Sequence, residues 1–187
     1  MAANTRELIL QAARQSAQAH GYGGLNFRDL AMQVGIQAAS IHYYFPGKAD
    51  LGAAVARRYW EDAEIALETL SNELPTPIER LRRYPDIFRT ALENENRLCL
   101  GSFLAAEYID LPDSVAIEVQ TFTDINIAWL GREISAAFLA EPEASRRRAS
   151  AIFAALAGAQ LLARSRADML FYDSAVESFR IAGLLPT

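Results

Sequence analysis

Apolar residues recur every three or four positions along almost the whole chain, a spacing that places them on one face of an α-helix. Glycine and proline residues interrupt this pattern and divide it into segments. The expected helices cover about residues 4–20, 27–34, 38–45, 48–72, 78–94, 97–109, 113–139, 144–166 and 174–184. Pro85 lies inside the fifth segment, where it should kink or divide the helix. No segment shows the alternation of a strand, so the predicted fold class is all-α with about nine helices.

Two short helices near the N-terminus are joined by a tight turn. Asn26 is suited to cap the first, at 27–34, and Gly35 ends it before the second begins near residue 38. The expected inner faces comprise Phe27, Leu30, Ala31, Val34, Ile36 and Ile41. This arrangement is typical of a helix-turn-helix, whose second helix enters the major groove of DNA.

The charge of the chain is unevenly distributed. The whole sequence carries a net charge of −5. Residues 1–60 hold six cationic and three acidic side chains, for +3, and the twelve cationic and twenty acidic side chains that remain give −8. A basic N-terminal part on an acidic body concentrates the attraction for phosphate. This favours a nucleic-acid partner, although an excess of three charges also arises by chance.

Several kinds of function find no support in the sequence. No run of about 18 apolar residues is present, and the N-terminus lacks the apolar core of a signal peptide. Cys99 is the single cysteine and cannot form an internal disulfide, which fits a reducing compartment. The two histidines, His20 and His42, both lie near the N-terminus, and no cluster has the spacing of metal ligands. We therefore expect a cytoplasmic protein without a membrane partner, enzymatic activity, cofactor or metal.

Short motifs follow one another in a fixed order between about residues 6 and 55. They are Gly21-Tyr22, FRDLA at 27–31, Gly35-Ile36, SIHYYF at 40–45, Gly47-Lys48 and Leu51. Their order and spacing resemble the N-terminal domain of tetracycline-repressor-type (TetR/AcrR) transcriptional regulators. The chain departs from the common family pattern at Leu25-Asn26, at His42 in place of tyrosine, and at Pro46 in place of lysine. The missing lysine removes one possible phosphate contact, whereas Asn26 keeps the capping chemistry.

The resemblance implies DNA-binding roles for ten residues. Asn26 and Arg28 would touch the phosphate backbone, and Tyr43, Tyr44 and Lys48 would contact phosphates from the other side of the turn. The groove-facing set would be Gln37, Ala38, Ala39, Ser40 and His42. Some alternatives remain open, because either tyrosine can pack into the core and Arg28 can simply be solvated.

The resemblance also implies two domains. Residues 1–50 would form an N-terminal three-helix DNA-binding domain with the helix-turn-helix, and residues 51–187 a C-terminal helical domain for effector binding and dimerisation. The segment 144–166 is apolar around much of its circumference, so a single copy would not cover it. Pairing with 174–184 and with a second copy would form a four-helix interface, and we therefore expect a homodimer through the last two helices.

Aromatic residues on successive helices of this second part are candidates for an apolar effector pocket. The predicted ligand-binding residues are Phe88, Cys99, Phe103, Phe122, Asn126 and Trp129. The alternative is that they fill the core. The stretch around Cys99 is loosely similar to one in relatives that sense electrophiles, whereas a thiol among apolar neighbours is usually inert.

These features predict a ligand-responsive transcriptional regulator. In its simplest form it is a repressor that binds a palindromic operator as a dimer and is released by a small-molecule effector. Two alternatives remain. One is a helical small-molecule or electrophile-sensing protein without DNA binding, against which Arg28, Tyr43, Tyr44 and Lys48 argue. The other is an activator of the same fold, since repression and activation use the same DNA contacts.

Overall fold

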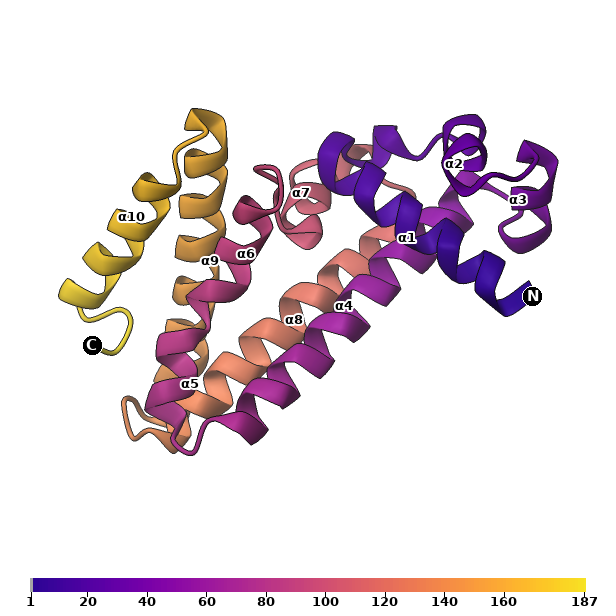
Figure 1. Ribbon diagram of the computed structural model, residues 1–187. Helices are drawn as coiled ribbons and strands as arrows, with labels where there is room; N and C mark the ends of the chain where they lie inside the picture. The colour runs from indigo at the N-terminus through magenta and orange to yellow at the C-terminus, as the bar shows by residue number, and fades with distance from the viewer. Residues whose placement is uncertain (1) are drawn as a thin grey trace. The chain divides into compact units, whose positions relative to one another are not determined.

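A computed structural model describes residues 2–187 and contains ten α-helices and two short 3₁₀ helices (Figure 1). They are α1 (Ala2–His20), η1 (Tyr22–Gly24), α2 (Phe27–Val34), α3 (Ala38–Tyr44), α4 (Lys48–Glu73), α5 (Pro77–Arg83), α6 (Pro85–Glu93), α7 (Leu100–Ala106), η2 (Tyr108–Asp110), α8 (Asp113–Ala136), α9 (Pro142–Arg166) and α10 (Met169–Ile181). Residues 2–187 include no strand, and the all-α prediction is confirmed. Pro85 divides the predicted fifth helix into α5 and α6, because a proline nitrogen cannot donate a helical hydrogen bond.

The described chain falls into two compact units. The first unit comprises the described residues up to Asp62 together with Leu100–Phe122, and the second comprises Ala63–Cys99 with Thr123–Thr187. Helices α4 and α8 contribute residues to both. The predicted boundary between residues 50 and 51 separates DNA binding from effector binding, and it stays a prediction.

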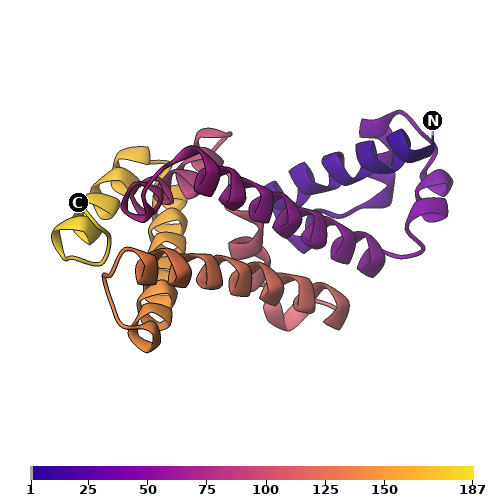
Figure 2. The same cartoon turned by 90° about the horizontal axis from the view of Figure 1, so that it is seen from below.

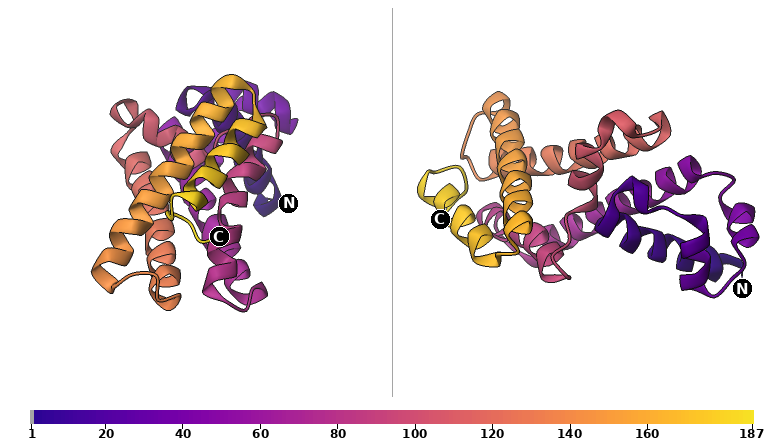
Figure 3. Two further views of the ribbon diagram at one scale, coloured as in Figure 1. Left: turned by 90° about the vertical axis from the view of Figure 1, so that its left-hand side faces the viewer. Right: turned by 90° about the horizontal axis from the view of Figure 1, so that it is seen from above.

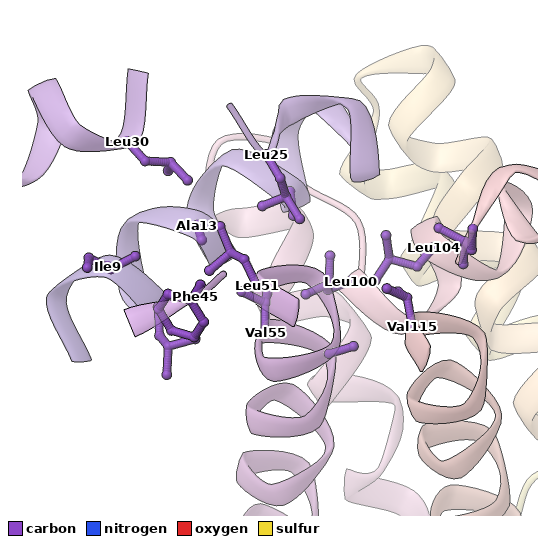
Figure 4. Packing of buried hydrophobic residues seen from close by; sticks show 14 of the residues in the cluster. Ile9, Ala13, Leu25, Leu30, Phe45, Leu51, Val55, Leu100, Leu104 and Val115 are labelled. Carbon is purple, nitrogen blue, oxygen red and sulfur yellow. The ribbon is translucent and has the colours of Figure 1, made fainter. Parts of the chain in front are cut away.

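The core of the first unit forms where α1 to α4 meet α7 and the beginning of α8. Side chains from these helices converge in Figure 4, and α1, α2 and α3 gather at the N-terminal end of α4 in Figure 2. Ile9, Leu30, Ile41 and Leu51 come from four different helices and are fully buried. Burying a side chain of this size stabilises the fold by roughly 1.5–3 kcal/mol. The inner face of the helix-turn-helix is therefore anchored in this core.

Local hydrogen bonds set the bounds of α2 as predicted. The side-chain oxygen of Asn26 accepts from the backbone N–H groups of Arg28 at 2.9 Å and Asp29 at 3.3 Å, which satisfies two donors at the start of the helix. Gly35 ends the helix in the left-handed conformation, with φ of 74°. The next N–H, from Ile36, turns back to the carbonyl of Ala31 at 3.0 Å.

A side chain from far along the sequence holds the turn between α1 and α2. The carboxylate of Glu107 accepts the backbone N–H of Tyr22 at 2.7 Å. A Cβ atom at Gly21 would overlap this carboxylate, and φ at Gly21 is 65°. Glycine is therefore required at this position for its conformation and for the space it leaves.

The second unit is built around α9, with α6 and α10 packed against it (Figures 1 and 3). Gln160 of α9 is fully buried and bonds in two directions. Its amide nitrogen donates to the carbonyl of Phe88 at 2.7 Å, and its oxygen accepts the N–H of Cys99 at 3.1 Å. Both polar ends of this core side chain are therefore satisfied, as burial requires.

Several predicted helix ends differ from the structure, and three of them have a local cause in the backbone. The segment 97–109 becomes helical only at Leu100, because Glu95 and Asn96 both adopt left-handed φ of 56°. Helix α8 ends at Ala136 rather than 139, and Phe138 follows with φ of 54°. Helix α10 begins at Met169, five residues before the predicted start, because Asp168 caps it through the N–H groups at 170 and 171.

Candidate DNA-binding surface and effector region

Helix α3 separates its side chains cleanly between core and solvent. Ile41 is fully buried, and Phe45, directly after the helix, is 2% exposed. The five predicted groove-facing residues are all exposed: Gln37, Ala38, Ala39, Ser40 and His42. The structure therefore leaves this set open to solvent, with Gln37 at the N-cap of α3 and the other four on the helix itself.

The two tyrosines that end α3 lie differently. Tyr43 is 81% exposed, whereas Tyr44 is half-buried and packs against the core of the first unit. Their rings meet edge to face with centroids 5.0 Å apart. Tyr43 is thus exposed to solvent beside the open face of α3. Its ring rests against the ring of Tyr44, which packs on the core.

The residues that flank the turn are also placed. Asn26 and Arg28 are exposed at the start of α2, although the side-chain oxygen of Asn26 is engaged in capping. The Lys48 ammonium lies 4.5 Å from the ring centroid of Tyr22, and burial raises the pKa of the Tyr22 phenol. The ring therefore stays neutral and attracts the cation. His42 is oriented by Phe27, at 4.8 Å between ring centroids, and by a contact of 3.2 Å from Nδ1 to the carbonyl oxygen of Pro46.

One cation beside this surface is not among the predicted site residues. The guanidinium of Arg6, on α1, lies 5.2 Å from the ring centroid of Phe45 at the end of α3. Arg6 is exposed and adds a positive charge next to the open face. Its position depends on how α1 packs against α3, and the only signal in the sequence was its membership of the basic N-terminal part.

A buried carboxylate joins α4 to α8 within the first unit. Glu118 is 6% exposed and accepts from Trp60 Nε1 at 2.7 Å and from Arg57 Nε at 3.1 Å. A second nitrogen of Arg57, Nη2, also contacts the carboxylate. Burial alone would raise the pKa of Glu118, but the hydrogen bonds from Arg57 and Trp60 outweigh it and hold this pKa below its ordinary value. The carboxylate is therefore ionised at neutral pH.

The six residues predicted to bind an effector do not belong to one unit. Phe103 and Phe122 lie in the first unit, and the other four lie in the second. Phe122 packs on Tyr59 with ring centroids 5.3 Å apart, and any side chain at Gly101 would overlap its ring. Phe103, on α7, is half-buried.

In the second unit, three of the predicted ligand residues surround Tyr84. Asn126 accepts a hydrogen bond from the Tyr84 hydroxyl at 2.7 Å, while Trp129 and Phe88 contact its ring at centroid distances of 5.5 and 5.9 Å. None of the three is more than 3% exposed. Cys99 is buried separately, with its N–H bonded to Gln160. The four predicted ligand residues of the second unit are therefore part of its core. A role in ligand binding stays a prediction for all six.

Helices α9 and α10 expose apolar side chains along their length. Leu161 and Leu162 of α9 are 51% and 52% exposed, and Leu170 and Ile181 of α10 are 75% and 79% exposed. Gly158 is exposed on α9, and a Cβ atom there would meet no neighbouring atom within 4 Å. The protomer thus leaves an exposed apolar surface on its last two helices, and Gly158 lies on the α9 part of this surface.

Two other kinds of feature are absent from residues 2–187. No group of three or more histidine, cysteine or acidic side chains is arranged to hold a metal ion there. Within the same residues, no helix combines the length and apolarity needed to cross a bilayer.

Comparisons with known proteins agree on one family. Residues 9–55 match the family model described as bacterial regulatory proteins, tetR family. The chain is similar to a TetR transcriptional regulator from Legionella pneumophila, with 30% identity, coverage of 94% of this chain and 95% of that chain, and a TM-score of 0.88. It is likewise similar to a TetR-family regulator from Agrobacterium tumefaciens, with 27% identity, coverage of 94% and 95%, and a TM-score of 0.87.

A curated relative matches over a shorter stretch. The probable HTH-type transcriptional regulator YttP of Bacillus subtilis is 28% identical over 76 residues. This stretch is 41% of the present chain and 37% of the length of that relative.

Proposed function

Because the chain belongs to the tetR family of bacterial regulatory proteins, which are DNA-binding transcriptional regulators and not enzymes, we propose that it is a repressor of transcription. In this proposal a homodimer occupies a palindromic operator in the cytoplasm and blocks transcription there. A small-molecule effector then releases the dimer from DNA. The observation that supports this most directly is the open face of α3, opposite the buried side chain of Ile41.

Residues around α3 divide by chemistry into two groups. Gln37, Ser40 and His42 offer polar groups to base edges in the major groove and would set sequence preference. Arg28 and Lys48 offer charge, and Tyr43 offers a hydroxyl, to the phosphate backbone. Such contacts would hold the helix in register without reading sequence. Asn26 and Tyr44 would support the same backbone contacts, and Ala38 and Ala39 leave room for the groove wall.

Dimerisation would proceed through α9 and α10. A second copy would cover the exposed leucines of α9 together with Leu170 and Ile181 of α10, and Gly158 would let the two copies of α9 approach closely. The resulting two-fold axis would set the two copies of α3 about 34–36 Å apart, one turn of DNA. Affinity for an operator would then depend on both half-sites being matched.

Effector control would act through this spacing. We place the effector in the helical part, residues 51–187, and DNA binding in residues 1–50. An effector that binds better to a conformer in which the two copies of α3 are spaced differently lowers the affinity for DNA. DNA binding lowers the affinity for the effector by the same coupling free energy. Helix α4 is the expected link, because it begins at Lys48 and is tied to α8 through the Arg57–Glu118 pair.

Selection of bound duplexes from a random DNA pool tests the proposal. The enriched sequence should be palindromic, and its binding should weaken with salt with a log–log slope of about −5 or steeper. Lys48→Ala should weaken binding to all sequences, whereas Arg82→Ala, an exposed arginine of α5, is the control that should not. No enrichment by a well-folded dimer would contradict DNA regulation, and activation of a reporter from the selected operator would contradict repression.

A matched pair of variants tests the dimer surface. Gly158→Glu adds a charged side chain that fits the single protomer but occupies the space of a partner. Ile65→Glu changes a residue of α4 that is 62% exposed and serves as the control. Sedimentation should show a monomer for the first variant and a dimer for the second. A dimeric Gly158→Glu variant would show that the interface lies elsewhere.

A further inference from the structure

A surface pocket of about 530 Å³ opens between α8 and α9 in the second unit. On the α8 side it is lined by Ile127, Gly131, Arg132 and Ser135, and on the α9 side by Arg146 and Ser150 among others. It contains none of the six residues predicted to bind the effector. Its most unusual feature is the presence of two arginines on opposite walls.

These two arginines lack the partners that most arginines of the same unit have. Arg80 pairs with Glu133 at 3.3 Å and Arg89 with Asp173 at 2.8 Å, while Arg148 donates to the carbonyl of Gly183 at 2.7 Å. Within residues 2–187, neither Arg132 nor Arg146 forms an ion pair or a side-chain hydrogen bond. Both are exposed. Their guanidinium groups are therefore free to bind an anion that enters the pocket.

The remaining lining makes the pocket asymmetric. Gly131 leaves space at its floor, where an added Cβ would stay 4.0 Å from Ala149 and from the backbone of Arg146. Arg146 lies in the second turn of α9, close to the positive end of the helix dipole. Asp124 lies eight residues before Arg132 on α8, about 12 Å along the helix axis. The positive charge is thus at one end of the pocket, and Ile127 lies between it and the negative end.

We propose that this pocket binds a small organic carboxylate. The charged group would lie between Arg132 and Arg146, which bind carboxylates through paired hydrogen bonds. A short apolar body would lie along Ile127 and Ala128. Asp124 would exclude ligands with a second negative charge at the far end. This inference concerns binding alone and does not depend on the chain being a repressor or on the effector region proposed above.

Calorimetric titration of the full-length protein with octanoate tests the site. Arg132→Gln and Arg146→Gln should each weaken binding by about tenfold, because each removes a charge-assisted hydrogen bond. Gly131→Leu should abolish binding by filling the floor. Arg82→Gln is the matched control, since Arg82 is also exposed and forms no ion pair in the described chain but does not line the pocket. Octanol, with the same body and no charge, should bind more weakly than octanoate.

Further measurements separate this inference from its rivals. Octanoate affinity that is unchanged in both arginine variants, or absent in the wild type, would overturn the proposal. A double variant that loses the dimer in sedimentation would instead assign the arginines to contacts between copies. Stronger binding of inorganic phosphate than of octanoate would overturn the carboxylate assignment. Circular dichroism checks that each variant is folded, and operator binding by the same variants shows whether the repressor proposal fails independently.

Discussion

The outer face of α3 and the cluster around Tyr84 both combine polar and aromatic side chains, but their surroundings are opposite. On α3, Ser40, His42 and Tyr43 are exposed and only Ile41 is buried. Around Tyr84, each polar group is bonded within the protein, as in the Tyr84–Asn126 hydrogen bond of 2.7 Å. The side chains of the first region are therefore available to an external partner, whereas the polar groups of the second are already hydrogen-bonded within the protein.

This difference shows what makes aromatic residues informative. An exposed aromatic side chain such as Tyr43 is not accounted for by packing in the core and stays available to an external partner. A buried aromatic with satisfied neighbours is accounted for by packing alone, as for Phe88. Composition does not separate the two cases, but burial does. The comparison can be tested by substitutions whose effects on stability should fall in a definite order.

The largest effect is expected at Phe88. Phe88→Ala removes a ring that is 2% exposed and should lower the free energy of unfolding by about 3–5 kcal/mol, through lost burial and a new cavity. Urea denaturation measures this loss. Tyr43→Ala, at a ring that is 81% exposed, is the control and should stay within about 0.5 kcal/mol. A stable Phe88→Ala variant would show that the Tyr84 cluster is not a packed core.

Gln160 should give the next effect. Gln160→Leu keeps an apolar stem but leaves the N–H of Cys99 without its acceptor and removes a side-chain donor from the carbonyl of Phe88, at a cost of about 1–3 kcal/mol. Gln120→Leu, at an exposed glutamine of α8, serves as the control. Equal unfolding midpoints for the two variants would contradict the role assigned to the buried amide.

A smaller loss is expected from removing the cap of α2. Asn26→Ala should cost about 1 kcal/mol, because two N–H groups at the helix start lose their acceptor. Asn26→Ser keeps an oxygen at this position and should recover most of the stability. Thermal unfolding followed by circular dichroism compares the three proteins. A serine variant as unstable as the alanine variant would mean that the cap is not the source of the effect.

The Glu118 carboxylate should make stability depend on pH. Because its native pKa is depressed below the ordinary value of 4.5, its contribution is present above that pH and is lost as the pH falls through the native pKa. Glu118→Gln should therefore be less stable than wild type at pH 7, by less than about 1 kcal/mol because Arg57 is exposed. The difference in stability between wild type and Glu118→Gln should decrease below pH 4.5. A gap that widens in acid, measured by urea unfolding, would reverse the assigned sign.

The smallest effect on stability is expected on the outer face of α3. Ser40→Ala and Gln37→Ala should each change the free energy of unfolding by less than about 0.5 kcal/mol. They should nevertheless change which duplexes are enriched from a random pool, since these side chains face the groove in our proposal. Unchanged enrichment would place sequence readout on other residues.

The sequence predicted the helix-turn-helix more accurately than the body. The bounds of α2 match at both ends, because Asn26 and Gly35 mark them locally. The start of α7 was wrong, since the segment before it is fixed by Gln160, a residue far along the chain that bonds to the N–H of Cys99. The start of α10 was also wrong, although Asp168 was a local capping signal in the sequence.

The candidate site shows the same limit. Helical spacing was enough to place Ile41 inside and Ser40 outside on α3. It was not enough to show that Arg6 would lie over Phe45, or which tyrosine would pack, because both depend on how helices meet. For the aromatic residues of the body, periodicity gives the same inward direction for a core residue and for a pocket residue. Sequence alone therefore left that choice open.

The contact between Glu107 and the turn at Gly21 has a consequence for engineering. Exchanging DNA-reading modules between regulators is an attractive way to build new genetic circuits, and a junction after the helix-turn-helix would be the obvious choice. In this chain such a graft would separate Gly21 and Tyr22 from the acceptor that holds them. A transplanted module would need a carboxylate at the position of Glu107 in its new host, and hosts could be ranked by that single criterion before any chimera is made.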